Sequence, residues 1–414
     1  MSKFCANSVL ILGHTCEAGM GERVLALKLK KAIEELGFKV EPILDLFELM
    51  GSAYEPLAHL NFDLAKSDFQ ILEEVNHPVF KRIGEAIGAS SADIFLILSW
   101  ATSVAALFAL GIQRKAPIAV KLQVHHRNEC VLTRLYEPAD LLITESLLAN
   151  ERGVDYGIPP GKMLYLPHYY PSICEKITPS RQYVKRLAQS QKKRVGPETV
   201  VIGMVSRLEY GKNCEFAVEA VRRLAAKGRD VVLVLKGDFP KNSPYPDYRP
   251  HFSSMLEAYI SEPWLLWDRS QTSFPEVMHE YASFDVCLHL SGAEGGSHVV
   301  VEYLGLGKPV VVLNATTNPY LFAHAVLFVR ALPQMKGGGL YFQMPDIEDL
   351  MEKLEEVVVD EKGRKLLAKQ ALKIAKERFH IDRVKQKLPL LFEPAGSSKK
   401  IERFYDEDRK LYGL

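Results

Sequence analysis

The stretch SGAEGGSHVVVEYLGLGKPVVV, residues 291–312, decides the fold of this chain. An apolar strand predicted over 285–290 leads into its Gly-rich turn. A short helix is predicted over 297–306, and Gly307 ends it. A second buried strand is predicted over 310–313. A buried strand, a glycine turn and a helix leading to another buried strand are typical of an α/β fold with a parallel sheet.

Two carboxylates in this stretch, Glu294 and Glu302, stand eight residues apart, one on the turn and one on the helix. Gly295 and Gly296 let the backbone approach a ligand closely. The start of the helix directs free N–H groups at that ligand, which suits a phosphate. Carboxylates beside a phosphate accept hydrogen bonds from sugar hydroxyls. The alternative is a pair of ordinary glutamates, one on a solvated loop and one on a helix.

A second motif, SRLEYGKN at residues 206–213, follows a short apolar strand predicted over 200–205. Its cations, Arg207 and Lys212, lie on the loop between that strand and the next helix. Two cations before a helix N-terminus form a diphosphate site that needs no metal. Both motifs follow strands of one predicted sheet, and ligands gather outside the carboxyl ends of such strands. The alternative is two surface cations.

The C-terminal half resembles the nucleotide-sugar domain of retaining family-4 glycosyltransferases of the GT-B fold. The family pattern is approximately G-R-L-x-x-x-K-G, then E-G-F-G-x-P-x-x-E-A-x-A-x-G-x-P-V-V, against SRLEYGKN and EGGSHVVVEYLGLGKPVV here. The resemblance extends to TSFPEVMHEYASFDVCLHLSGAEGG (272–296) and GLYFQMPDIEDLMEKLEEVV (339–358). It covers most of the chain and is strongest over 200–379.

The resemblance implies a hexosyl transfer from a nucleotide-diphosphate sugar, such as a UDP-sugar, to a hydroxyl acceptor, with retention at the anomeric carbon. Arg207 and Lys212 would hold the donor diphosphate and stabilise it as it departs, Glu294 would face the sugar hydroxyls, and Glu302 would bind the ribose. The departing phosphate would act as the base, with no metal and no cofactor. Further donor contacts would come from Gly295, Gly296, Ser297 and His298.

The chain departs from the family pattern at Ser297, at Val299 and in NATTNPYLF, residues 314–322, where no Glu stands at the expected place. This change motivates a second hypothesis, a GT-B-shaped nucleotide-sugar-binding or scaffold protein without catalysis. A sugar phosphorylase shares the fold, but that class usually needs a pyridoxal-phosphate lysine and a longer chain.

The N-terminal half is predicted to be a separate α/β unit. Buried strands alternate with helices, which indicates another parallel sheet. Its first strand is followed by GHTCEAGMGER, which lacks the G-x-G-x-x-G of a nicotinamide-binding fold at the right place. The predicted strands are 9–13, 39–44, 94–99, 118–124 and 141–144, with a helix over 22–36.

Two pieces of the N-terminal half resemble family site segments. Gly19 and Gly21, with Arg23, resemble the Gly-rich loop that closes over the donor diphosphate, the alternative being a plain loop. His125, at the end of the strand 118–124, resembles a catalytic His. His126 is the alternative, because adjacent residues of a strand point to opposite faces. A core or loop histidine remains open, and the weaker cleft candidates are Arg127 and Glu129.

The overall prediction is two Rossmann-like domains facing a central cleft, since single cores stop growing near about 250–300 residues. The predicted parts are 1–180 (acceptor-binding domain), 181–198 (linker), 199–385 (nucleotide-sugar domain) and 386–414 (a segment crossing back to the N-terminal domain).

Composition narrows the class of protein. A net charge of +1 gives no nucleic-acid footprint. Six Cys without a C-x-x-C indicate reduced thiols in a cytoplasmic protein. The sequence indicates no signal peptide and no membrane span. The expected partners are the donor and a carbohydrate, lipid or other hydroxyl acceptor. Weak peripheral membrane contact stays open for the basic run 181–194.

Overall fold

The protein is described from a computed structural model. Its chain divides into two compact units: unit 1 comprises Met1–Pro167 and Ile381–Leu414, and unit 2 comprises His168–His380. The residues that the structure describes are 8–13, 20–45, 85, 88–98, 118–121, 139–155, 157–240, 247–274, 276–292, 294–333, 335–337, 340–392 and 398–413.

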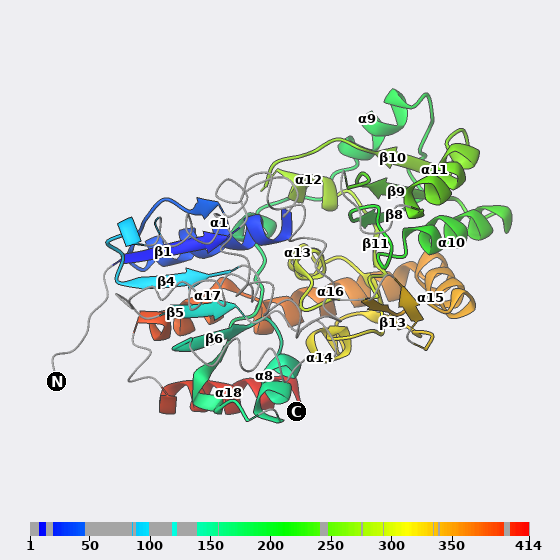
Figure 1. Ribbon diagram of the computed structural model, residues 1–414. Coiled ribbons are helices and arrows are strands. Elements are labelled where there is room, and N and C mark those ends of the chain that lie inside the picture. Colours follow the sequence, from blue (N-terminus) through cyan, green and yellow to red (C-terminus); the bar gives the residue numbers. More distant parts are fainter. Residues whose placement is uncertain are drawn as a thin grey trace, which may run out of the picture. The chain divides into compact units, whose positions relative to one another are not determined.

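Unit 1 is built on a seven-stranded sheet (Figure 1). Its strands are β1 (Ser8–Gly13), β2 (Lys39–Val40), β3 (Leu44–Asp45), β4 (Ile94–Ile97), β5 (Ile118–Lys121), β6 (Leu141–Thr144) and β7 (Met163–Tyr165). They lie in the order β2-β1-β4-β5-β6-β7, with β3 beside β1, and every neighbouring pair is parallel. The sheet is the parallel one that the alternating pattern predicts.

The helices that the structure describes in unit 1 pack beside this sheet and include the C-terminal segment. They are α1 (Met20–Glu35), α8 (Leu147–Asp155), α17 (Ile381–Lys387) and α18 (Ser398–Tyr412), with short 3-10 helices at Pro160–Lys162 and Leu388–Phe392. In α1, Leu25, Leu29 and Ile33 are buried at helical spacing, so this face packs onto the sheet.

The C-terminal segment is fixed to β7 by buried polar contacts. Lys387 and Asp408 form an ion pair in which both side chains are about fully buried. The Lys387 Nζ also donates a hydrogen bond to the backbone oxygen of Tyr165, at 3.0 Å. The hydroxyl oxygens of Tyr165 and Tyr412 lie 2.8 Å apart. These contacts tie both ends of the segment to the first sheet.

Unit 2 contains a six-stranded, fully parallel sheet. Its strands are β8 (Val200–Val205), β9 (Val231–Lys236), β10 (Leu265–Asp268), β11 (Val286–His289), β12 (Val310–Leu313) and β13 (Leu327–Val329). The order is β10-β9-β8-β11-β12-β13. The strands read as continuous apolar runs because both faces of a parallel sheet are covered. β14 (Met335–Gly337) and β15 (Leu340–Phe342) form a separate antiparallel hairpin.

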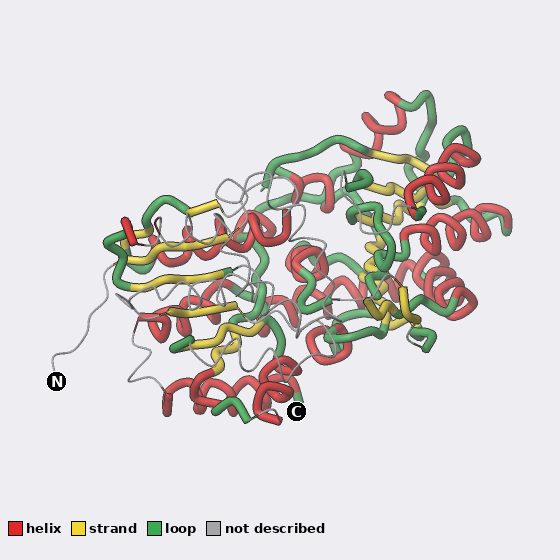
Figure 2. Tube along the Cα trace, in the orientation of Figure 1, coloured by secondary structure: helices red, strands yellow, loops and turns green. Residues whose placement is uncertain are grey.

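Helices flank the strands of unit 2, as Figure 2 shows in red beside yellow. They are α9 (Gln182–Ser190), α10 (Cys214–Ala226), α11 (Tyr248–Tyr259), α12 (Val277–Tyr281), α13 (His298–Gly305), α14 (Asn318–Phe322), α15 (Ile347–Val359) and α16 (Glu361–Arg378), with a 3-10 helix at Ser172–Glu175. Ala217, Val218, Val221 and Leu224 of α10 are fully buried, and these residues form one apolar face.

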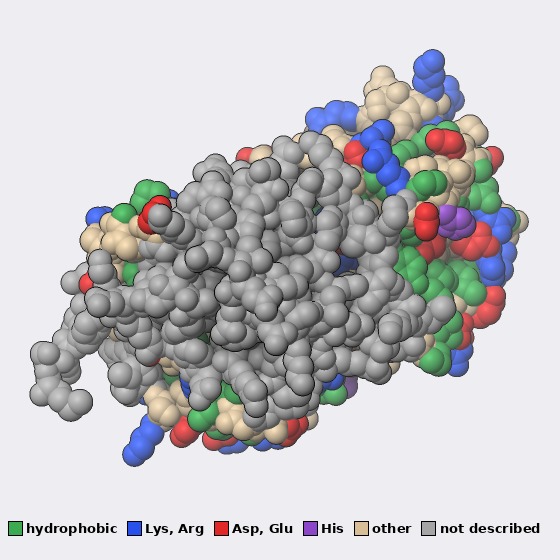
Figure 3. Space-filling model, viewed as in Figure 1, with side chains coloured by type: hydrophobic (Ala, Val, Ile, Leu, Met, Phe, Trp, Pro, Cys, Tyr) green, Lys and Arg blue, Asp and Glu red, His purple; other side chains and the backbone are tan. Residues whose placement is uncertain are grey.

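The surface of unit 2 carries interspersed charges, visible around α10 and α15 in Figure 3. Glu355 of α15 accepts from Lys227 and Arg229, at 2.7 Å each. Arg223 of α10 pairs with Glu348 at 2.8 Å. Exposed pairs of this kind contribute about 0–1 kcal/mol each, so the buried face, not the charges, holds α10 in place.

The basic run 181–194 contains α9 and lies in unit 2. Arg181 pairs with Asp285 at the start of β11, at 2.5 Å. The Tyr183 hydroxyl donates to Asp268 at the end of β10, at 2.6 Å. These contacts fasten the run to the second sheet. The domain boundaries at 180, 198 and 385 stay predictions.

Most predicted elements are present, with small shifts at their ends. The strands predicted over 200–205, 310–313 and 141–144 match β8, β12 and β6 residue for residue. The strand predicted over 39–44 is wrong as one element, because only the two-residue strands β2 and β3 form there. Residues 122–124, the end of another predicted strand, lie outside the described residues.

Candidate functional site

The two predicted motifs of unit 2 meet at an ion pair. Lys212 lies on the loop between β8 and α10, and Glu294 lies on the loop between β11 and α13. The Lys212 Nζ is 2.6 Å from Glu294 Oε1 and donates to Ser291 Oγ at 3.2 Å. Their side chains are 20% and 15% exposed. Because β8 and β11 are parallel neighbours, their carboxyl ends bring together residues 82 positions apart.

The loop that carries Lys212 is held by backbone and amide contacts. Asn213, in a left-handed conformation at φ 56°, stands at the N-cap position of α10, and its Nδ2 donates to the backbone oxygens of Leu290 (2.7 Å) and Gln343 (3.0 Å). The amide of Gly292 donates to the oxygen of Gly211 at 2.8 Å. A Cβ at Gly292 would lie 2.0 Å from the Gln343 oxygen, so only glycine fits there. The Lys212 and Glu294 loops are therefore fixed to each other.

Glu294 is a buried anion kept charged by its neighbours. Burial would raise its pKa, but Lys212 and His289 outweigh this and lower the pKa to about 2. His289, the last residue of β11, has its Nε2 3.6 Å from Glu294 Oε1. Burial lowers the pKa of His289 to about 4, with Lys212 adding to the effect and Glu294 opposing it. At neutral pH the cluster holds one cation, one anion and a neutral imidazole.

The N-terminus of α13 is formed as predicted. Ser297 is its N-cap, and the Ser297 side chain accepts from the amide of Val300 at 3.3 Å. Gly307, at φ 63°, follows the C-terminus of α13 and ends the helix there. Glu302, one turn after His298, is 4% exposed. The helix therefore presents its start, and the preceding Gly295–Gly296 turn, at the same edge of the sheet as Lys212.

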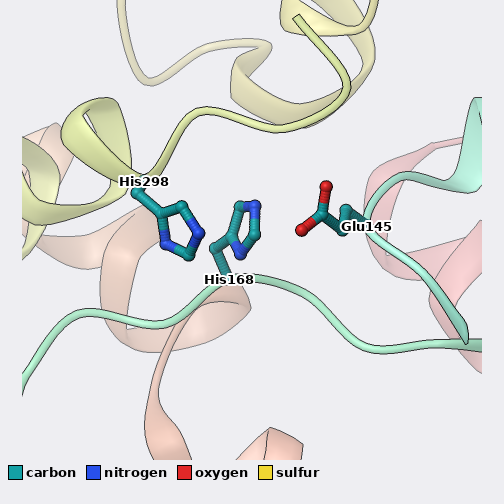
Figure 4. Close-up of side chains that lie close together, drawn as sticks. All are labelled: Glu145, His168 and His298. Carbon is teal, nitrogen blue, oxygen red and sulfur yellow. The ribbon is translucent and has the colours of Figure 1, made fainter. Parts of the chain in front are cut away.

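His298 lies against a second histidine that the sequence prediction does not include. The rings of His298 and His168 have centroids 3.4 Å apart and planes at 33°, and Figure 4 shows them side by side. His168 is the first residue of unit 2 and is 4% exposed. This contact orients the His298 ring at the start of α13.

Arg207 is the most exposed of the predicted donor-binding residues. Its side chain is 49% exposed, and its guanidinium pairs with Glu209 at 2.8 Å. The contact lies within one loop and is close to solvent, so it costs little to break. Arg207 can therefore turn toward a ligand at this edge.

The altered stretch 314–322 contacts Glu294 through backbone groups. The Thr317 hydroxyl donates to the Glu294 oxygen at 3.1 Å, and the Glu294 amide donates to Thr316 Oγ1 at 3.3 Å. Thr316 is left-handed at φ 53°. The two threonines thus hold the backbone of the glutamate loop.

Most of the site residues predicted in the N-terminal half lie outside the part of the chain that the structure describes. His125 and Gly19 lie outside the described residues, as do His126, Arg127 and Glu129. The backbone of Gly21 lies in the first turn of α1, in unit 1. The roles of these residues stay predictions.

The sequence prediction missed His289, Ser291 and Asn213. One signal could have indicated His289: a histidine as the last residue of a buried strand, five positions before Glu294. The contacts of Asn213 with Leu290 and Gln343 depend on the fold, and no sequence pattern marks them.

A pH dependence of stability follows from the buried His289. Its folded pKa of about 4 lies below the ordinary value of 6.5, so the unfolded chain binds more protons between these values. Stability is therefore lost as pH falls from 6.5 toward 4, by about 3 kcal/mol at most from this group. Denaturant unfolding of wild type and His289→Gln across this range measures it. The free energy of unfolding of wild type minus that of His289→Gln should decrease as pH falls, and a difference that does not change with pH would contradict the prediction.

Comparison with known proteins finds one family that matches most of unit 2. The family described as "Glycosyl transferases group 1" matches residues 185–374, the greater part of that unit. A search of curated proteins gives no match. No helix in the described ranges combines the length and apolar character needed to cross a membrane.

Solved structures match over nearly the whole chain. Anabaena Alr3699/HepE in complex with UDP and glucose has a TM-score of 0.63 at 16% identity, covering 93% of this chain and 98% of its own. An alpha,alpha-trehalose-phosphate synthase (UDP-forming) from Burkholderia xenovorans, in complex with glucose-6-phosphate, gives 0.69 at 14%, covering 93% and 100%. Sucrose-phosphate synthase from Thermosynechococcus elongatus gives 0.69 at 14%, covering 95% and 100%. Residues 185–374 therefore match the glycosyl transferases group 1 family, and the chain has the α/β, parallel-sheet fold of GT-B proteins.

Proposed function

We propose that the protein transfers a sugar from a nucleotide-diphosphate sugar to a hydroxyl acceptor, with retention at the anomeric carbon, as a family-4 enzyme. The observation that carries the proposal is the cluster at the carboxyl ends of β8 and β11. A cation, an anion and a capped helix start lie there on two loops fixed to each other. Proteins of the same fold that were solved with UDP or UDP-glucose support UDP as the nucleotide.

The diphosphate is the part of the donor that this site suits best. Lys212 offers a largely buried ammonium, Arg207 offers a guanidinium that is half exposed, and the start of α13 offers backbone N–H groups. The remaining donor contacts are Gly295 and Gly296, through the backbone, with Ser297 and His298. As the bond to the sugar breaks, negative charge grows on the departing diphosphate, and these groups stabilise it.

The sugar and the ribose are assigned to the two glutamates. Glu294, kept ionised by Lys212, accepts from sugar hydroxyls, and Glu302 accepts from ribose hydroxyls. The departing phosphate takes the acceptor proton, as the family resemblance implies. Lys212 and the helix start supply the positive charge that a divalent cation supplies elsewhere, so no metal or cofactor enters the proposal.

His125, Gly19 and Gly21 complete the proposal from the N-terminal half, as the resemblance implies. His125 would face the reacting sugar, and the two glycines would close over the diphosphate. The acceptor is a carbohydrate, lipid or other hydroxyl compound. We place the protein in the cytoplasm, supported by the buried, free thiols of Cys214 and Cys287.

Replacing the cations tests the donor site. Lys212→Ala and Arg207→Ala should each weaken binding of a nucleoside diphosphate by about 1.5–3 kcal/mol, the worth of a hydrogen bond to a charged group. Calorimetric titration with UDP measures the loss, and Lys227→Ala, on the exposed end of α10, is the matched control. Unchanged affinity in both variants would overturn the diphosphate assignment.

Binding without turnover is the outcome that favours the alternative function. If the wild type binds a nucleotide sugar but consumes none with any acceptor, the chain is a catalytically silent binding protein. The altered stretch 314–322, which lacks the family's Glu, would then be the first place to look for the cause.

A further inference from the structure

His289 is a buried polar group that the proposed chemistry has not used. Its Nε2 is fully enclosed and has no hydrogen-bond partner among the residues that the structure describes. The side chain is 10% exposed, and Nε2 faces Glu294 Oε1 at 3.6 Å, just beyond hydrogen-bond distance. A buried nitrogen left in this state is costly, so its position next to Glu294 calls for an explanation.

The charge balance around Glu294 changes when a diphosphate arrives. In this structure Lys212 donates to Glu294 and to Ser291. A diphosphate brings at least two negative charges to the same ammonium, which draws Lys212 away from the carboxylate. Glu294, only 15% exposed, then loses part of what keeps it ionised and oriented.

His289 is positioned to replace the hydrogen bond that Lys212 then no longer donates to Glu294. It stands at the end of β11, an inner strand of the sheet, and its Nε2 needs a movement of less than about 1 Å to reach hydrogen-bond distance. A neutral imidazole can donate through Nε2, and the neutral form is the one expected here. Ser291 and Lys212 are the other groups facing the carboxylate from neighbouring residues.

We infer that His289 is a positioning residue of the donor site: when Lys212 turns to the diphosphate, His289 Nε2 donates to Glu294 and keeps that carboxylate directed at the donor sugar. This inference rests on the proposed function. It predicts that His289 matters for the step involving the sugar and not for holding the nucleotide.

Two amide variants with side chains of different length test whether His289 takes over from Lys212 as the donor to Glu294. His289→Gln places an amide N–H near the position of Nε2, whereas His289→Asn is one methylene shorter and cannot reach Glu294. We expect kcat to fall about tenfold or more in His289→Asn, the worth of one hydrogen bond to a charged group, and to stay within about threefold of wild type in His289→Gln. The UDP dissociation constant should change less than about twofold in both, with His251→Asn, an exposed position on α11, as the control.

The outcomes separate this inference from the proposed function. If the wild type binds no UDP and consumes no nucleotide sugar, the proposed function fails, and this inference fails with it. If the wild type is active and His289→Asn matches His289→Gln in kcat, only the positioning role is overturned. An equal loss of UDP affinity and kcat in His289→Asn would also overturn it, because that result indicates a disturbed fold.

Discussion

Glu294→Gln is expected to lower the rate of sugar transfer by roughly 10²–10³-fold, the usual cost of removing one electrostatic contact to the transition state. The substitution keeps the size of the side chain and removes its charge. The carboxylate is held ionised by Lys212 at 2.6 Å. A neutral amide oxygen accepts from sugar hydroxyls more weakly and carries no negative charge to stabilise the positive charge that develops on the ring. Binding of the nucleoside diphosphate should not weaken, because Lys212 loses a competing anion.

The opposite responses of rate and binding make this prediction specific. Steady-state kinetics with a nucleotide sugar gives the rate, and calorimetry with UDP gives the affinity. Glu209→Gln, which removes the charge of the residue that pairs with Arg207, is the matched control. The rate should stay within about threefold, because Arg207 is 49% exposed and its ion pair contributes little. A Glu294→Gln enzyme with wild-type rate would exclude a role for Glu294 at the sugar. Lost UDP affinity at normal rate would place this residue at the nucleotide instead.

Asp408→Ala is expected to destabilise unit 1 by about 3–5 kcal/mol, the cost of leaving a buried charge unpaired. The Lys387 side chain is 1% exposed and that of Asp408 is 2% exposed, so the ammonium left behind has no access to water. Arg383, the other partner of Asp408 at 3.1 Å, is 29% exposed and can turn to solvent. The effect should therefore come from Lys387 alone.

A double variant distinguishes the effect of losing the ion pair from the effect of losing side-chain packing. Lys387→Met with Asp408→Leu replaces both charges by apolar groups of similar size and should recover most of the lost stability. Denaturant unfolding followed by circular dichroism measures all three proteins. An Asp408→Ala protein as stable as wild type would contradict the buried pair. A double variant no better than the single one would show that packing, not charge, is what Asp408 supplies.

The sequence predicts the second sheet well because its signals are local. Apolar runs of four to six residues define β8 and β12, with Pro309 directly before β12, and an N-cap serine with a glycine stop defines α13. The two-residue strands β2 and β3 depart from prediction because strand length depends on pairing with β1, which no local pattern encodes.

The site residues also divide into those that local sequence signals predict and those whose contacts depend on the fold. Lys212 and Glu294 were each predicted from their own loops, and their contact follows from the parallel pairing of β8 with β11. Asn213 could not be predicted, since its contacts with Leu290 and Gln343 join residues distant in the chain, whereas the place of His289 at the end of a buried strand was a local signal. The attachment of α9 to Asp268 and Asp285 is another long-range effect, and a basic run gives no sign of it.

The first-formed anomer of the sugar released from a nucleotide sugar tests the central claim most directly. Without an acceptor, a retaining transferase should slowly hydrolyse its donor, and proton NMR can follow the anomeric signal before mutarotation mixes it. From an α-linked donor such as UDP-glucose, tested within a panel of nucleotide sugars, we predict that the α anomer appears first, at a rate abolished by Glu294→Gln. Release of the β anomer first, or no consumption of any donor by the wild type, would contradict the account.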